Sequence, residues 1–228
     1  MSTRLLTTLR AAAPHAALVA LLASAPGCML WPWDPKENTT IITPGMRAAS
    51  IREMGPRAKD GDSEAQTKAC EQLALQIRTE PDPIVRRAIQ ETVADFETPM
   101  ASAMLIAGLN DEDRDVKVTC CRELGKRKEP KAIAPLGNLV AKDSDLDVRL
   151  AAVDALGAMK TKESIASLAA ALKDRDPAMQ YAGVEAMKKV SDEDLGNDVQ
   201  AWRQYADRIA GPAPAASIAT QPGDTTVK

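Results

Sequence analysis

The chain has 228 residues, a formal net charge of −3, 27% charged residues and 3% aromatic residues. Its only histidine, His15, lies in a segment that we expect to be removed. A mature chain without histidine excludes serine or cysteine catalysis with a histidine base and also histidine-ligated zinc. The negative charge becomes −5 once Arg4 and Arg10 are removed, and no basic stripe is present, so nucleic-acid binding is disfavoured.

Residues 1–27 have the pattern of a bacterial export signal, with Arg4 and Arg10 before a short apolar run. The run is shorter than the about 20 apolar residues that span a membrane. The pair Gly27-Cys28 resembles the end of a lipobox, which implies lipidation of Cys28 in the cell envelope, facing the periplasm, although the two residues before Gly27 are unusual there. Ordinary cleavage after Ala25, giving a soluble exported protein, and a retained N-terminus are the alternatives.

Residues 28–45 form a linker that contains Trp31, Trp33 and several prolines, so a regular helix is not expected there. The two indoles directly after Cys28 could lie at the level of the lipid headgroups. They could equally be incidental residues of a linker.

A regular repeat begins after an N-terminal cap at 46–79, which we expect to contain two helices, 46–57 and 63–79. Aspartates recur at intervals of 31 or 32 residues, and each lies three residues before an apolar residue. An aspartate at this position caps the N-terminus of a helix. The aspartates are Asp82, Asp113, Asp145 and Asp176, and the repeats that they begin are 82–109, 113–142, 145–173 and 176–206.

Each repeat is expected to contain two helices. The first carries an apolar stripe at helical spacing and ends near a glycine, Gly125 or Gly157, where a C-cap belongs. The second carries one row of equivalent leucines: Leu105, Leu136 and Leu168. Such a helix pair cannot bury its stripes alone, so neighbouring pairs must stack. The pattern therefore predicts an all-α fold, an α-solenoid of antiparallel helix pairs.

The segments DVKVTCCRELG (115–125) and DVRLAAVDALG (147–157) resemble the short HEAT-like repeat that also occurs in phycobilisome lyases. The resemblance extends over 46–206. It implies a right-handed superhelix with the second helices on its concave face. It also raises a lyase-like or enzyme-accessory role, against which the export signal argues, because those enzymes work inside the cell.

The end of the array is expected to be a final helix capped by Asp198, on which Trp202 and Tyr205 cover the last repeat. Ligand stacking is the less favoured interpretation of Trp202. Residues 207–228 contain few large apolar residues, which predicts a disordered tail.

The cysteines and the aspartate runs have ordinary structural explanations. Cys70, Cys120 and Cys121 fall on core rows, so we interpret them as small buried hydrophobes rather than redox or metal residues. The runs around Asp113 and Asp145 lack the glycine and glutamate of an EF-hand, which makes them turn and cap residues, with a weak surface calcium site as the alternative. No catalytic group, metal site, cofactor or small-molecule substrate is indicated.

A candidate partner-binding face lies on the second helices, on the side away from the leucine row. Small and weakly charged residues there favour contact with a protein, although alanine is also simply the best helix former. The site residues are Met100, Met104, Lys131, Asn138 and Ser167. We therefore expect a non-catalytic interaction scaffold held at the membrane by a lipid anchor; a purely structural envelope protein is a further alternative.

Overall fold

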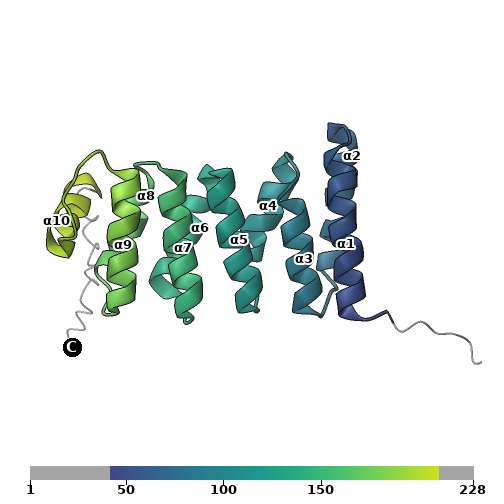
Figure 1. Ribbon diagram of the computed structural model, residues 1–228, viewed down its shortest axis with the longest axis horizontal. Coiled ribbons are helices and arrows are strands. Elements are labelled where there is room, and N and C mark those ends of the chain that lie inside the picture. Colours follow the sequence, from purple (N-terminus) through teal and green to yellow (C-terminus); the bar gives the residue numbers. More distant parts are fainter. Residues whose placement is uncertain (1–41, 211–228) are drawn as a thin grey trace, which may run out of the picture. The chain divides into compact units, whose positions relative to one another are not determined.

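The computed structural model describes residues 42–210, and this part of the chain consists of ten α-helices and one 3-10 turn, without strands (Figure 1). The predicted all-α fold is confirmed. The helices are α1 (Pro44–Lys59), α2 (Ser63–Ile77), α3 (Pro83–Val93), α4 (Pro99–Gly108), α5 (Arg114–Arg127), α6 (Ile133–Lys142), α7 (Leu146–Met159), α8 (Ser164–Leu172), α9 (Pro177–Val190) and α10 (Val199–Ala210), and the turn η1 (Pro130–Ala132) precedes α6.

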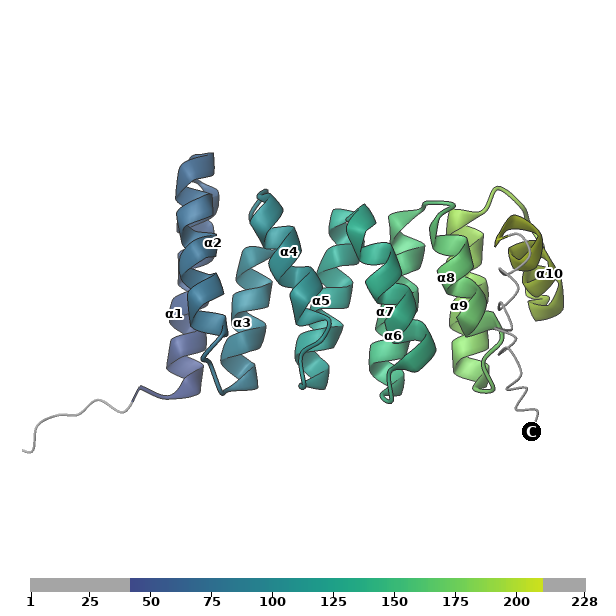
Figure 2. The same ribbon diagram turned by 180° about the vertical axis from the view of Figure 1, so that it is seen from behind.

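The helices of residues 42–210 alternate between two layers (Figures 1 and 2). The first helices α1, α3, α5, α7 and α9 pack side by side in sequence order, and the second helices form the other layer. Several second helices also pack on the first helix of the next pair, as α6 does on α7 and α8 on α9. This stacking of helix pairs is an α-solenoid, as predicted.

The predicted N-caps of the repeats are all present. Each capping carboxylate accepts a hydrogen bond from a backbone N–H two or three residues further on, at 2.8 to 3.2 Å. The N–H donors belong to Ile84, Val116, Val148 and Ala178. These bonds satisfy backbone donors that the first helical turn leaves free, and they fix where each repeat begins.

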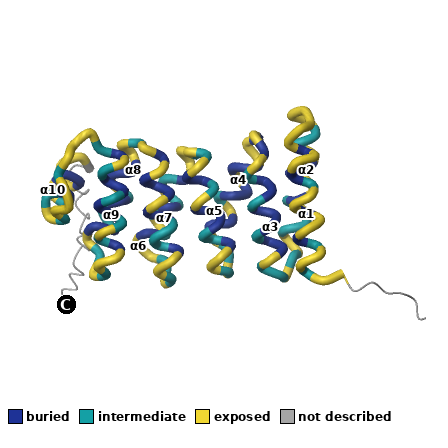
Figure 3. The backbone as a smooth tube through the Cα atoms, in the orientation of Figure 1, coloured by how far each residue is buried: buried dark blue, intermediate teal, exposed yellow. Residues whose placement is uncertain are grey.

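One hydrophobic core runs through the stacked pairs (Figure 3). The predicted row of Leu105, Leu136 and Leu168 is fully buried, as is Leu156 on α7. At the C-terminal end Trp202 is buried, and its Nε1 donates to the carbonyl oxygen of Gly196 at 3.0 Å. Because Trp202 is buried, its structural interpretation is confirmed. Asp198 caps α10, as predicted.

The prediction that Gly125 and Gly157 are C-caps is wrong. The helices α5 and α7 continue past them, and Lys128 and Lys160, each with φ of 53°, occupy the left-handed positions instead. A Cβ built on Gly125 would lie 2.8 Å from Cα of Ala155 on α7. The glycine is therefore required by the close approach of two helices, not by the end of one.

Two predicted boundaries also differ. Helix α1 begins at Pro44, two residues inside the expected linker, because Thr43 caps it and proline suits the first helical position. Helix α10 continues through 207–210, which had been assigned to the tail. The remainder of the tail, the signal segment, Cys28, Trp31 and Trp33 lie outside the described residues. Within 42–210, no helix combines the length and the apolar character needed to cross a bilayer.

Candidate functional site

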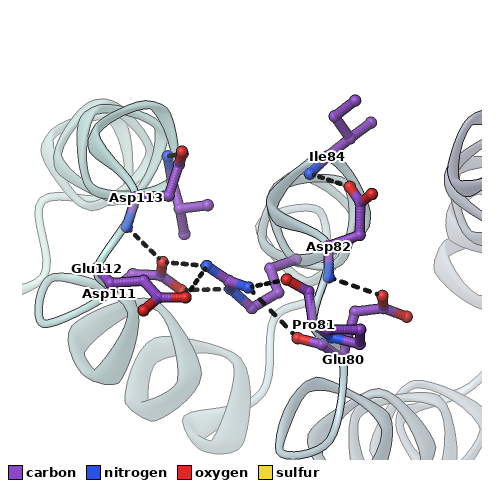
Figure 4. A network of polar contacts seen from close by, with 9 residues as sticks. Glu80, Pro81, Asp82, Ile84, Asp111, Glu112 and Asp113 are labelled. Atoms are coloured by element: carbon purple, nitrogen blue, oxygen red, sulfur yellow. Dashed lines mark hydrogen bonds and ion pairs between the residues drawn. The ribbon is translucent and has the colours of Figure 1, made fainter.

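A ladder of ion pairs connects successive repeats. A cation on a first helix reaches the carboxylate that lies just before the next first helix in the chain. Arg86 on α3 contacts Asp111 with its Nη2 2.9 Å from Oδ1 (Figure 4). Lys117 on α5 contacts Asp143 in the same way, and Arg149 on α7 contacts Asp174. The equivalent residue on α9 is Gln180, whose amide instead donates to the carbonyl oxygen of Asp174.

The carboxylates of this ladder also hold the loops that carry the N-caps. Asp143 accepts the backbone N–H of Asp145 at 2.9 Å, and Asp174 accepts that of Asp176 at 2.8 Å. The pKa of Asp174 is lowered by this backbone bond and then by Arg149. Burial alone would raise the pKa of Asp143, but its bonds with Lys117 and the Asp145 N–H outweigh burial, so that pKa is lowered too. The ion pairs of the ladder thus have a structural role: they fix the register of each first helix against the loop that begins the next repeat.

The sequence interpretation of the aspartates as turn and cap residues is confirmed by these bonds. Within 42–210, no group of three or more histidine, cysteine, aspartate or glutamate side chains is placed to hold a metal ion. The basic partners of the ladder were missed, although a signal was available: Lys117 and Arg149 each directly follow the central valine of their repeat.

The cysteines of the described part are core residues. Cys70, Cys120 and Cys121 are free thiols with no exposed surface, which confirms the interpretation as buried hydrophobes. Burial raises the pKa of Cys121 to about 12 and raises that of Cys120 well above its ordinary value. A thiol that does not ionise near neutral pH is a poor nucleophile and a poor metal ligand.

Four of the five residues predicted for the candidate face are exposed or half-buried, and one is not. Met100 on α4, Lys131 in η1 and Asn138 on α6 are exposed, and Ser167 on α8 is half-buried. Met104, however, is only 8% exposed, so its assignment to the face was wrong. The buried stripe of α4 runs through Ala101, Met104, Leu105 and Gly108, and the exposed line runs through Met100, Ala103 and Ala107.

The second helices in the middle of the array are almost free of charge. Helices α4 and α8 contain no charged residue, and α6 contains only Lys142, in a chain that is 27% charged. The first helices differ, because they carry exposed ion pairs such as Arg52 with Glu91 and Arg114 with Asp147. Helices α4, α6 and α8 therefore present a strip across three repeats whose only charged residue is Lys142, and we call it the second-helix face. Its exposed residues are Pro99, Met100, Ala103, Ala107, Ala134, Asn138, Ala141, Lys142 and Ala166.

The match to a family model agrees with this architecture. The family model for HEAT repeats matches residues 70–156 and 133–207. A crystal structure of an engineered protein is similar with a TM-score of 0.43 and 16% identity, over 75% of this chain and 92% of that one. No curated protein matches the sequence. HEAT repeats are typical of protein-interaction scaffolds. The matched segments together cover more than half of the residues of this chain, and the chain therefore belongs to the HEAT-repeat family.

Proposed function

We propose that the protein is a non-catalytic scaffold, held at the bacterial envelope through Cys28, that captures a protein partner on the second-helix face. The observation that carries this proposal is the absence of charge from that face across α4, α6 and α8, apart from Lys142 at the end of α6. Charged groups are depleted from the centres of protein interfaces, because burying an unpaired charge costs free energy. An uncharged face of this extent suits burial against a partner.

Helix propensity alone does not account for the pattern. Alanine is the best helix former, but glutamate, lysine, arginine and glutamine are nearly as good at exposed positions. The first helices of the same repeats use such residues, as Arg122 and Lys126 do on α5. If helix formation were the only requirement, charged residues would be allowed on both layers of helices. A requirement for contact with a partner explains why they are missing from the second helices α4 and α8 and nearly so from α6.

Introducing a negative charge on the face tests the capture of a partner. We expect Ala166→Glu on α8 to reduce the amount of partner recovered with the protein from envelope fractions, while the melting temperature stays unchanged. The matched control is Ala158→Glu on α7, since Ala158 is also an exposed helical alanine but lies in the first layer. Equal recovery with both variants would contradict the assignment of the face.

The anchoring part of the proposal rests on the sequence of residues 1–28. Fractionation and intact-mass analysis of the protein made in a bacterial host would test it, with Cys28→Ala as the comparison. We expect a membrane-bound product that carries lipid mass, and a variant that loses both the mass and the membrane association. A soluble product that retains His15 would contradict export and lipidation together.

A further inference from the structure

The layer of second helices is interrupted at one place. Within residues 42–210, α2 packs on α4, α6 on α8 and α8 on α10, but α4 and α6 make no comparable contact. The chain between α5 and α6 contains the left-handed Lys128 and the turn η1, which no other repeat shows as a 3-10 element. An open cleft of about 720 Å³ lies here, between α4 and the end of α5 with η1. Its volume is in the range of about 300 to 1,000 Å³ that is usual for ligand-binding clefts.

The walls of this cleft differ in character. Helix α4 supplies the apolar residues Pro99, Ala103 and Ile106, of which Pro99 and Ala103 are exposed. The opposite side is polar and comes from Arg127, Glu129 and Lys131. The cleft therefore combines an aliphatic wall on the second-helix face with a polar rim.

Most charged groups of the rim already form hydrogen bonds within the protein. Arg127 donates from Nη1 to the carbonyl oxygens of Ala94 and Phe96, at 3.0 and 2.8 Å, and from Nη2 to Oγ of Ser102 at 3.3 Å. A hydrogen bond with Ser102 holds the pKa of Glu129 below its ordinary value, and the nearby Lys131 and Arg127 act in the same direction.

The remaining lining charges also balance. Lys59 is paired with Asp95, with Nζ 3.5 Å from Oδ1. The lining as a whole contains three basic residues, Lys59, Arg127 and Lys131, and three acidic ones, Asp95, Glu97 and Glu129. A lining without net charge gives no overall long-range attraction to an acidic or a basic ligand.

We propose that this cleft is a docking site for a short, uncharged aliphatic segment of a partner protein, which fills the space between α4 and the end of α5 with η1. The proposal rests on the proposed function and locates one part of the contact. Aliphatic side chains can bury against Pro99, Ala103 and Ile106 without leaving a charge unpaired. A charged side chain would lose part of its hydration there, and Arg127 and Glu129 on the rim already have partners within the protein.

A displayed library of short random peptides, selected on the purified full-length protein, tests this site. We expect enrichment of uncharged sequences rich in aliphatic residues, and their dissociation constants are then measured by fluorescence anisotropy. Ala103→Glu should raise the dissociation constants of the selected peptides by about tenfold or more, because it places a carboxylate in the aliphatic wall. The matched control is Ala158→Glu, at an exposed alanine of α7 that lies outside both the cleft lining and the second-helix face, which should leave peptide affinity unchanged.

The outcomes separate this site from the proposed function. Selection of charged peptides, failure to select any peptide, or equal loss with Ala103→Glu and Ala158→Glu would overturn the cleft proposal. The proposed function would survive these results if Ala166→Glu still reduced the recovery of the whole partner. If peptides bind as expected but Ala166→Glu has no effect on partner recovery, the cleft proposal is supported and the proposed role of the wider second-helix face is contradicted.

Discussion

Replacing Gly125 by alanine is expected to destabilise the protein, although alanine is the better helix former. Gly125 is buried in the interior of α5, and an added Cβ would lie 2.8 Å from Cα and 3.1 Å from Cβ of Ala155 on α7. The nearest atom belongs to the backbone, so no side-chain rotation can relieve the contact. The helices must move apart, which disturbs the packing of two repeats.

The magnitude follows from two opposing effects. The gain in helix propensity from glycine to alanine is about 0.8 to 1.0 kcal/mol. Overpacking in a well-packed core costs about 1 to 3 kcal/mol, and a contact with backbone belongs to the upper part of that range. We therefore expect a net loss of about 1 to 2 kcal/mol in the free energy of unfolding, which lowers the melting temperature by roughly 2 to 8 °C in a domain of this size.

Gly45→Ala is the matched control for this change. Gly45 is exposed in the first turn of α1, and an added Cβ would meet only Oγ1 of Thr43, at 3.9 Å. The same substitution should therefore leave the stability unchanged or raise it by up to about 1 kcal/mol. Urea denaturation of both variants beside the wild type measures the two effects. A Gly125→Ala protein that is as stable as the wild type would refute the close approach of α5 and α7.

Three further expectations concern the core, the ladder and the thiols. Leu156→Ala should cost about 2 to 5 kcal/mol in urea denaturation, because Leu156 is fully buried at a repeat interface; a cost below about 0.5 kcal/mol would contradict the stacking. The pKa of Asp174 is lower in the folded state, so its stabilisation is complete above the ordinary aspartate value near 4 and is lost as the pH falls through the lower folded value. Asp174→Asn should therefore be less stable than the wild type at neutral pH and lose less stability on acidification, and parallel pH profiles would argue against the ladder. Because burial raises the pKa of Cys121 to about 12, a thiol reagent at neutral pH should label it only after unfolding, and rapid labelling of the folded protein would contradict its burial.

The features that could be predicted from the sequence are those that depend on local or strictly periodic interactions. The cap of Asp145 reaches only to the N–H groups of Asp147 and Val148, and such a short-range bond is visible in the residue pattern alone. The leucine row through Leu136 repeats at the spacing of the array, and stacking of identical units places equivalent residues in one core.

The features that were missed depend on how neighbouring helices meet. The contact of Gly125 with Ala155 is set by the distance between α5 and α7, which no sequence spacing gives. Met104 was misplaced because α4 is apolar or small on every side, so its periodicity does not identify the buried stripe. The cleft beside α4 is lined by residues from Lys59 to Lys131, which only the tertiary packing of α1, α4, α5 and η1 brings together.

Photo-cross-linking in the cell tests most directly whether partners bind the second-helix face. A cross-linking amino acid would be placed at Ala134 on α6 or Ala107 on α4, and for comparison at Asp154 or Ala158 on α7, all of which are exposed. We expect a discrete adduct of one mass from the first two positions and none from the two positions on α7. Adducts from α7 alone, or equal adducts from both layers, would contradict the claim that the second-helix face on α4, α6 and α8 is the binding surface.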